Sequence, residues 1–213
     1  KMRKRINRHL NQRSEMLSGI SHDLRTPLTR IKLQLAFIKD KQLSNKLSGD
    51  VMEMEKMLNE YLQFSKNRSS EKGEKFNLSK LLDDTIKKYS NKNIAIEISQ
   101  NILFHGKKNL INRCISNLLD NAVKYGKNIE VSLKKSNNNI ILLIDDDGPG
   151  IPKNEYENVF KPFYKIDKSR SETKSSVGLG MSIASDIIQS HGGNIKLEKS
   201  ILKGLRVKIT LPF

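Results

Sequence analysis

The chain has 213 residues, of which 36% are hydrophobic, so it is long enough for one or two domains with a modest buried core. Its 39 Lys and Arg residues outnumber 23 Asp and Glu residues and give a net charge of +16, which favours acidic partners such as nucleotides, acidic proteins, nucleic acid or a membrane surface. Because the basic residues are spread along the whole chain, no specific nucleic-acid site is expected. The single cysteine, Cys114, excludes an internal disulfide and is typical of a reducing compartment. No apolar run approaches the roughly 20 residues that a membrane span needs, and no signal peptide is visible.

Two amphipathic helices are predicted in the first third of the chain. Between residues 14 and 40, apolar side chains recur at alternating spacings of three and four, which gives a helix one continuous apolar seam. The stretch "DKQLSN" (40–45) interrupts this pattern, and a second seam then runs through Leu47, Val51, Met54, Leu58 and Tyr61. Two such helices form an antiparallel hairpin, and one hairpin cannot cover both seams, so a homodimeric four-helix bundle is expected.

The first helix carries the stretch "SHDLRTPLTR" (21–30). His22 is followed directly by Asp23, and Thr26 lies four residues after the histidine on the same polar face. A neutral imidazole is a good nucleophile near neutral pH, and a neighbouring carboxylate can orient it and accept its proton. Pro27 removes a backbone hydrogen bond, so a bend is expected beside the histidine. The alternative is a histidine in a loop with no chemical role.

After a polar stretch, the pattern changes from helices to a mixture of strands and helices. The segment 76–90 starts as a strand and becomes a helix, and the alternation in 93–99 predicts a strand with one buried face. Helices are predicted at 109–125, where an apolar pattern also predicts a buried Cys114, and at 178–193, and strands at 128–135, 139–147, 194–200 and 204–213. This order predicts an α+β layer with the helices on one face of the sheet.

Two clusters in this second part pair polar side chains with glycines. In "NLLDNAVKYG" (117–126), Asn117 and Asn121 share a helix face, and amide oxygens suit Mg²⁺, while Lys124 and Tyr125 lie within reach of a phosphate or sugar. The alternative is an exposed Asn-rich face.

In "DDDGPGIP" (145–152), the glycines allow the backbone to approach a ligand closely. An aspartate at the end of the strand can accept a hydrogen bond from an exocyclic amine and so select adenine. An ordinary acidic surface turn is the alternative.

Two further clusters follow. In "VFKPFYKIDKSR" (159–170), aromatic side chains can anchor a loop whose cations meet phosphates, or they can simply plug a surface loop. In "SVGLGMSIA" (176–184), Gly178 and Gly180 open a helix, and the free N–H groups of a helix N-terminus bind phosphate. Each cluster alone has a structural explanation, but their order behind a histidine-bearing hairpin argues against coincidence.

In this order the motifs resemble the cytoplasmic core of a bacterial sensor histidine kinase, over nearly the whole chain. "SHDLRTPLTRIK" is similar to the H box of that family, "NLLDNAVKYG" to the N box, "DDDGPG" to the G1 box, "VFKPFYK" to the F box and "GLG" to the G2 box. Within the family, "GISHDLRTPLTRI" and "DDDGPGIP…FKPF" are most similar to the osmosensor-type kinases of Gram-negative bacteria.

The resemblance implies an all-α dimerisation hairpin, a four-helix bundle in the homodimer, followed by an α+β Bergerat-type (GHKL) ATP-binding sandwich. It implies that His22 is phosphorylated from ATP and passes the phosphoryl group to an aspartate of a response-regulator receiver domain. Asp23 and Thr26 complete an H-D-x-x-T pattern, in which Thr26 serves dephosphorylation of the regulator.

The same resemblance assigns the nucleotide site, with ATP and Mg²⁺ as cofactors. It makes Asn121 the Mg²⁺ ligand, supported by Asn117, and implies that Asp146 binds adenine. It gives phosphate contacts to Lys124, Lys165 and Arg170, and further nucleotide contacts to Tyr125, Gly148, Gly150, Phe160, Gly178, Leu179 and Gly180.

The implied organisation is the end of a signal-transmitting helix (1–13), the histidine hairpin (14–68), a linker (69–75) and the ATP-binding domain (76–213). The first residue is Lys1 and not methionine, so the chain is expected to be a fragment. The stretch "KMRKRINRHLNQRSE" (1–15) resembles the end of a signal-transmitting helix, which implies that the chain is the cytoplasmic part of a bacterial inner-membrane protein. Ser176 stands where the family usually has the first glycine of its last box, so nucleotide closure is expected to be weaker or slower.

Three alternatives stay open. The first is a phosphatase-biased or pseudokinase regulator that binds ATP with little autokinase activity. The second is an ATP-driven machine of the chaperone, topoisomerase or mismatch-repair kind, which the His22 box argues against. The third is a basic nucleic-acid-binding scaffold. The stimulus, the regulator and transfer within or between protomers are not predicted.

Overall fold

The computed structural model describes residues 24–66, 71–166 and 178–213. The chain divides into two compact units, with a boundary between Glu71 and Lys72. His22 and Asp23 lie outside the described residues, as do Arg170 and Ser176. Of the helices within the described ranges, none is both long and apolar enough to cross a membrane.

The first unit contains the two predicted helices. Residues 24–35 are helical and include the exposed Thr26 and Pro27, and α2 (Lys41–Lys66) follows. The predicted seams meet in a small core that consists of Leu28, Leu35 and Val51, with Ile38, Leu47 and Leu58 packed against it. This core confirms the pairing of the two seams.

The break between the helices lies at residues 36–40, and the predicted loop at 40–45 is wrong. Oδ1 of Asp40 accepts hydrogen bonds from the backbone N–H groups of Gln42 (2.9 Å) and Leu43 (3.1 Å). Asp40 therefore caps the N-terminus of α2 and allows the helix to begin at Lys41.

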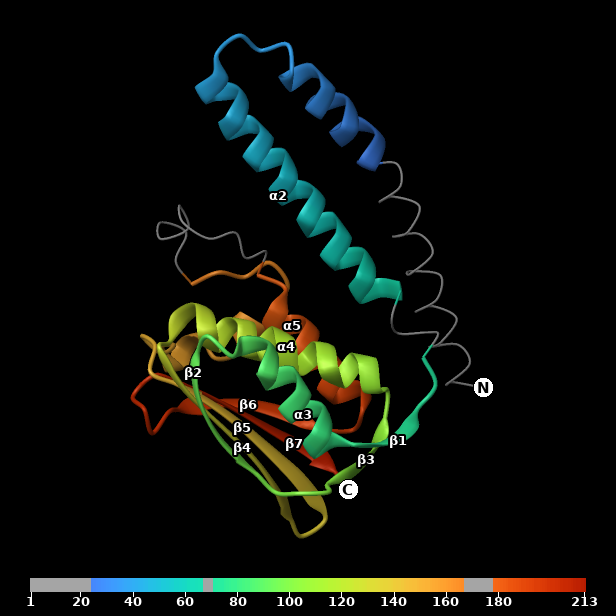
Figure 1. Ribbon diagram of the computed structural model, residues 1–213, viewed down its shortest axis with the longest axis vertical. Helices are drawn as coiled ribbons and strands as arrows, with labels where there is room; N and C mark the ends of the chain where they lie inside the picture. Colours follow the sequence, from blue (N-terminus) through green and yellow to red (C-terminus); the bar gives the residue numbers. More distant parts are fainter. Residues whose placement is uncertain (1–23, 67–70, 167–177) are drawn as a thin grey trace. The chain divides into compact units, whose positions relative to one another are not determined.

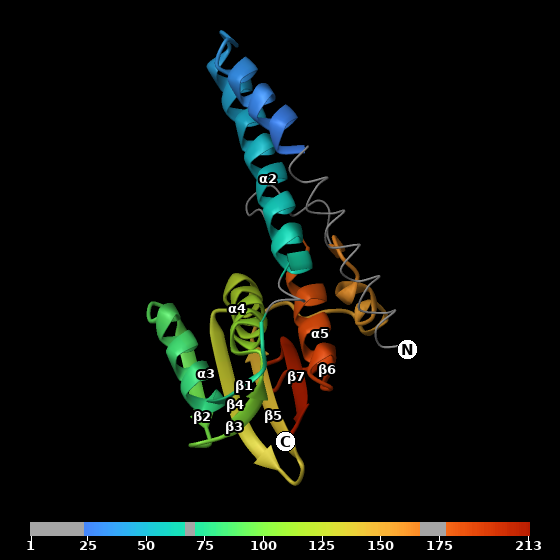
Figure 2. The same ribbon diagram turned by 90° about the vertical axis from the view of Figure 1, so that its right-hand side faces the viewer.

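In the second unit, three helices cover one face of a five-stranded sheet, as predicted (Figures 1 and 2). The helices are α3 (Leu78–Ile86), α4 (Lys108–Tyr125) and α5 (Gly180–Ser190). The strand order is β2-β4-β5-β7-β6, in which β2 is parallel to β4 and the other pairs are antiparallel. The strands are β2 (Asn93–Ile98), β4 (Asn128–Ser136), β5 (Asn139–Asp146), β6 (Asn194–Lys199) and β7 (Leu205–Pro212). Short 3-10 helices lie at η1 (Lys87–Tyr89), η2 (Lys153–Glu155) and η3 (Asn158–Phe160).

The core lies between the helices and the sheet. The side chains of Leu119 on α4 and Leu133 on β4 have 0% exposed surface, and the alternating residues of β4 and β5 point into the same layer. The predicted strand at 93–99 forms, but Ile96 on it is 48% exposed. Because β2 is an edge strand, the helix layer covers its inner face only in part.

A small second sheet was not predicted. It pairs β1 (Glu74–Asn77) with β3 (Leu103–Gly106) in an antiparallel arrangement. The strand start predicted at residue 76 belongs to β1, whereas β3 was missed, because a four-residue strand carries too little alternation to be recognised in a sequence.

Cys114 is buried in α4, as its apolar surroundings predicted, and burial raises the pKa of its thiol to about 12. The thiolate is the reactive form, so the folded protein is expected to resist alkylation by iodoacetamide at about pH 9. The unfolded protein should gain one label per chain in urea, as read by mass spectrometry. Equal labelling rates with and without urea would contradict this burial.

Candidate functional site

The polar face of α4 lies under the start of α5. A Cβ placed on Gly180 would lie 3.6 Å from Nδ2 of Asn121 and 3.9 Å from Cβ of Asn117, so the two predicted motifs meet here. Nδ2 of Asn117 is buried and, within the described ranges, has no hydrogen-bond partner. Buried donors are nearly always satisfied, so this amide fits a site that is completed by a ligand or by water.

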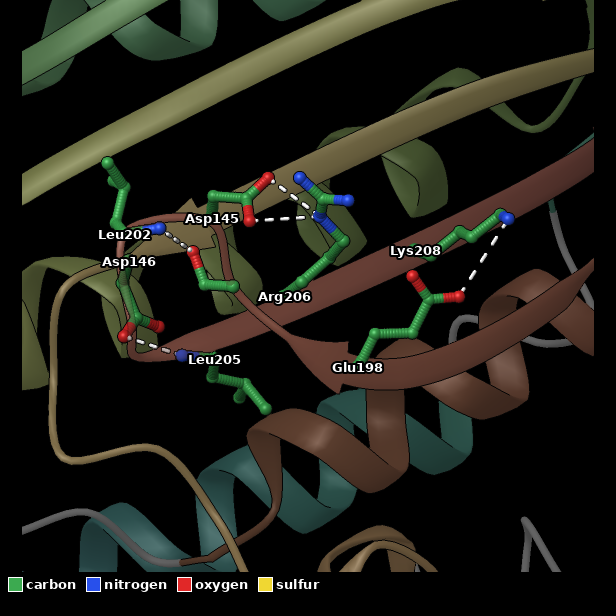
Figure 3. Close-up of polar contacts among 8 residues, drawn as sticks. Asp145, Asp146, Glu198, Leu202, Leu205, Arg206 and Lys208 are labelled. Carbon is green, nitrogen blue, oxygen red and sulfur yellow. Dashed lines mark hydrogen bonds and ion pairs between the residues drawn. The ribbon is translucent and has the colours of Figure 1, made fainter. Parts of the chain in front are cut away.

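Asp146 is the last residue of β5, directly before the Asp-Gly turn, and it is only 6% exposed. Its Oδ1 accepts hydrogen bonds from the backbone N–H groups of Gly148 (2.8 Å) and Leu205 (3.2 Å; Figure 3). Burial raises the pKa of Asp146 above its ordinary value, while these two hydrogen bonds lower it and Asp147 and Asp145 raise it further.

This turn also packs against the C-terminal end of α4. A Cβ on Gly148 would lie 2.9 Å from the carbonyl oxygen of Tyr125, so only a glycine allows the contact. Gly150 has a φ of +69°, which also favours glycine. The C-terminal end of the asparagine helix and the Asp-Gly turn therefore lie side by side.

The carboxylate of Asp147 links the Asp-Gly turn to the turn between α4 and β4. Its Oδ1 accepts from the backbone N–H groups of Lys127 (2.6 Å) and Asn128 (3.0 Å), and its Oδ2 accepts from Nδ2 of Asn128 (2.6 Å). The hydrogen bonds from Asn128 and Lys127 lower the pKa of Asp147 below its ordinary value. Asp147 thus holds the α4–β4 turn against the turn that follows Asp146.

Replacement of Asp147 by alanine is expected to lower the thermal midpoint at neutral pH. Because the pKa of Asp147 is depressed in the folded state, its stabilising effect is present above the pKa of the unfolded chain, about 3.9, and is lost as the pH falls through the lower folded pKa. The two melting curves should therefore differ at neutral pH and converge in acid, as followed by circular dichroism. Glu157→Ala, at an exposed acid in the same unit, is the control. A constant difference at all pH values would contradict this assignment.

The aromatic loop ends beside the start of α5. The backbone N–H of Phe163 donates to the carbonyl oxygen of Gly178 (3.0 Å), and Gly178 has a φ of +78°. The phenol of Tyr164 donates to Glu155, which raises the pKa of Tyr164 and lowers that of Glu155. These contacts fix the loop at residues 155–164.

The remaining predicted site residues differ in their exposure to solvent. Tyr125 is exposed, and Nζ of Lys124 lies 4.9 Å from the centroid of its ring. Phe160 and Lys165 are half-buried. The side chain of Leu179 is buried, so a ligand could meet only its backbone.

The sequence reading missed one part of the site, the turn between β6 and β7. Leu205 begins β7 and donates to Asp146, although neither residue type nor spacing suggests it. The only signal in the sequence is Gly204, directly before the last strand.

Comparison with known proteins identifies this arrangement. Residues 106–213 match the family described as histidine kinase-, DNA gyrase B- and HSP90-like ATPases, and residues 12–70 match the His Kinase A (phospho-acceptor) domain. The chain belongs to the sensor histidine kinase family. The predicted fold, a phospho-acceptor helical domain followed by a GHKL-type sandwich, is thereby confirmed.

Individual relatives agree with this assignment. The chain is 37% identical to the sensor histidine kinase GtrS of Pseudomonas aeruginosa over 213 residues, which cover 99% of this chain and 44% of GtrS. It is 31% identical to the sensor histidine kinase CpxA of Escherichia coli over 231 residues, which cover 97% of this chain and 48% of CpxA. The ATP binding domain of PrrB from Mycobacterium tuberculosis superimposes with a TM-score of 0.56 at 25% identity, over 67% of this chain and 98% of that domain. The sensor histidine kinase chain thus spans about half the length of the curated relatives it matches.

Proposed function

We propose that the chain phosphorylates its own His22 from ATP and transfers the phosphoryl group to an aspartate of a response-regulator receiver domain. The observation that carries the proposal is that the glycine start of α5 lies beside Asn117 and Asn121 of α4, while the Asp146 turn packs against the C-terminal end of the same helix. Among the described residues, the buried Nδ2 of Asn117 has no hydrogen-bond partner. Asn117 and Asn121, the Asp146 turn and the glycine start of α5 come from distant parts of the sequence. They stand in a chain that also carries the phospho-acceptor stretch.

In the proposed site, each group has a separate task. Oδ2 of Asp146 accepts from the exocyclic amine of adenine, and the N–H groups at Gly180 bind phosphate oxygens. Lys124, Lys165 and Arg170 neutralise further phosphate charge, and Tyr125 lies beside the nucleotide. Gly148, Gly150, Gly178 and Leu179 offer backbone to the ligand, and Phe160 anchors the neighbouring loop.

Mg²⁺ would be held by the amide oxygen of Asn121, with Asn117 in support. Its charge lowers the negative potential of the phosphates during transfer. Among the described residues, no group of three His, Cys, Asp or Glu side chains could hold a metal ion. An amide oxygen completed by water and nucleotide phosphates fits Mg²⁺, which keeps most of its waters.

In the transfer step, an imidazole nitrogen of His22 attacks the γ-phosphorus, a nitrogen–phosphorus bond forms, and the bond to the β–γ bridging oxygen breaks. ADP leaves with the electron pair of that bond. Asp23 accepts a hydrogen bond or proton from the ring, which keeps the attacking nitrogen unprotonated. The same resemblance supports a role for Thr26 in dephosphorylation of the regulator, and Thr26 is exposed on its helix.

We also propose that the helical unit forms a homodimer. Its internal core leaves large apolar side chains exposed on both helices and on the loop between them, among them Leu24, Ile31, Leu33, Phe37, Leu43, Met52 and Met54. A second hairpin would cover part of this surface and complete a four-helix bundle. Light scattering should therefore give the mass of two chains.

The finer assignments are proposals too. The domain boundaries at 14–68, 69–75 and 76–213, the osmosensor-type subclass, and a place as the cytoplasmic part of an inner-membrane sensor rest on the resemblance. No specific binding of nucleic acid is proposed.

The test is incubation of the chain with γ-³²P-ATP and Mg²⁺. Label that is lost in acid and stable in base would identify a phosphohistidine and support the proposal. Tight ATP binding without label would favour the phosphatase-biased or pseudokinase alternative, and absence of ATP binding would overturn the nucleotide site.

A further inference from the structure

The turn between β6 and β7 reaches the carboxylate that the proposed function assigns to adenine. The β5–β7 ladder ends at the pair Asp145–Arg206. One step further, the backbone N–H of Leu205 donates to the side chain of Asp146, at Oδ1 (Figure 3). At this position, the side chain of Asp146 therefore takes the place of the backbone acceptor that would continue the β5–β7 ladder. The hydrogen bond links Asp146 to β7.

Both hydrogen bonds to this carboxylate end on the same oxygen. Gly148 and Leu205 each donate to Oδ1, and within the described part of the chain Oδ2 receives none. Two donors from different segments fix the rotation of a carboxyl group better than one does. Oδ2 therefore has a defined direction in which it can accept a hydrogen bond from a ligand.

Gly204 makes this approach sterically feasible. A Cβ at this position would lie 2.5 Å from Oδ1 of Asp146 and 2.6 Å from the backbone nitrogen of Gly148. The second of these neighbours is backbone and cannot rotate away. Any side chain at residue 204 must therefore displace either the turn or the carboxylate.

The turn is built as a rigid unit. Ser200 is 5% exposed, its N–H donates to the carbonyl oxygen of Gly204 (3.1 Å), and its Oγ accepts from the N–H of Leu202 (3.0 Å). Beside it, Nε of Arg206 lies 2.9 and 3.0 Å from the two oxygens of the buried Asp145. This ion pair fastens the start of β7 to β5 where Leu205 must present its N–H.

We propose that the β6–β7 turn positions Asp146 for adenine recognition, through the N–H of Leu205 and the bare backbone of Gly204. Gly204 and Leu205 are positioning residues, because they act on the base through Asp146. The inference rests on the proposed function, in which Oδ2 of Asp146 accepts from the adenine amine.

The experiment compares ATP with purine riboside 5′-triphosphate, which lacks the amine, by calorimetry on the full chain with Mg²⁺. A hydrogen bond to a charged group predicts that the wild type prefers ATP by about tenfold or more. In Gly204→Ala, most of this preference should disappear while the affinity for the analogue stays near that of the wild type. A general loss of folding would instead weaken the binding of both ATP and the analogue.

Gly193→Ala is the matched control. A Cβ at Gly193 would lie 2.6 Å from the carbonyl oxygen of Thr210, so this variant is equally crowded but remote from Asp146. It should keep the preference for ATP even if it melts earlier. Where Gly204→Ala does not fold, replacement of Leu205 by its α-hydroxy acid removes the N–H donor, although it also weakens the Gly204 carbonyl as the acceptor for Ser200, and should give the same loss of preference.

The pH profile gives an independent readout. Since the N–H of Leu205 lowers the pKa of Asp146, its removal should move the acid decline of ATP affinity to higher pH. A wild type that does not prefer ATP would overturn the role of Asp146 in adenine binding. A wild type that prefers ATP, with both Gly204→Ala and the hydroxy-acid variant unchanged, would overturn the positioning role alone.

Discussion

Replacement of His22 by alanine is expected to reduce autophosphorylation from γ-³²P-ATP to background, a loss of about 10³-fold or more, while ATP binding stays unchanged. The reason is that the proposed reaction has one nucleophile, and alanine has no atom that can attack phosphorus. ATP affinity should persist because the motifs that bind nucleotide belong to the second compact unit. Labelling and calorimetry on the same preparation measure the two properties.

His105 provides the matched control. It is exposed on β3, so His105→Ala removes an accessible imidazole without touching the proposed nucleophile. His191 is unsuitable, because its Nε2 accepts from the N–H of Lys107 and its Nδ1 contacts the carbonyl oxygen of Ile187. Full labelling of His22→Ala, or loss of label only in His105→Ala, would contradict the assignment.

Replacement of Asp146 by asparagine is expected to weaken ATP binding by about 1.5–3 kcal/mol, roughly 10–150-fold. Asparagine can keep Oδ1 as the acceptor for Gly148 and Leu205, so the fold should survive. Its Nδ2 then replaces Oδ2 and presents a donor to the adenine amine, which is also a donor. A nucleotide with an acceptor at that position, inosine triphosphate, should bind the variant better than it binds the wild type.

Calorimetry with both nucleotides separates this exchange of specificity from simple damage. Glu157→Gln removes an exposed charge in the same unit and should change neither affinity. An Asp146→Asn variant that loses affinity for both nucleotides equally would indicate a structural role for the carboxylate. A variant that binds ATP as the wild type does would remove Asp146 from the site.

The helices and strands could be predicted from the sequence because their apolar patterns involve residues that are close together in the chain. Apolar spacing predicted the two helices whose seams meet at Leu28, Leu35 and Val51, alternation predicted β2, and two strands joined by an Asn-rich turn were predicted where β4 and β5 lie. The start of α2 was misplaced, because the cap at Asp40 is a matter of side-chain hydrogen bonding and not of periodicity. The exposure of Ile96 was missed for a related reason, since alternation does not reveal which strand will lie at the edge of a sheet.

By itself, the sequence determined the order of the motifs, the family that they resemble, and the residue types that could do the chemistry, because each motif is a short run of neighbours. Only the tertiary structure decided which groups surround Asp146. Leu205 lies 59 positions away in the chain, and its N–H reaches the carboxylate because β7 pairs with β5. A backbone N–H has no sequence signature of its own, and its partner is fixed only when the sheet forms.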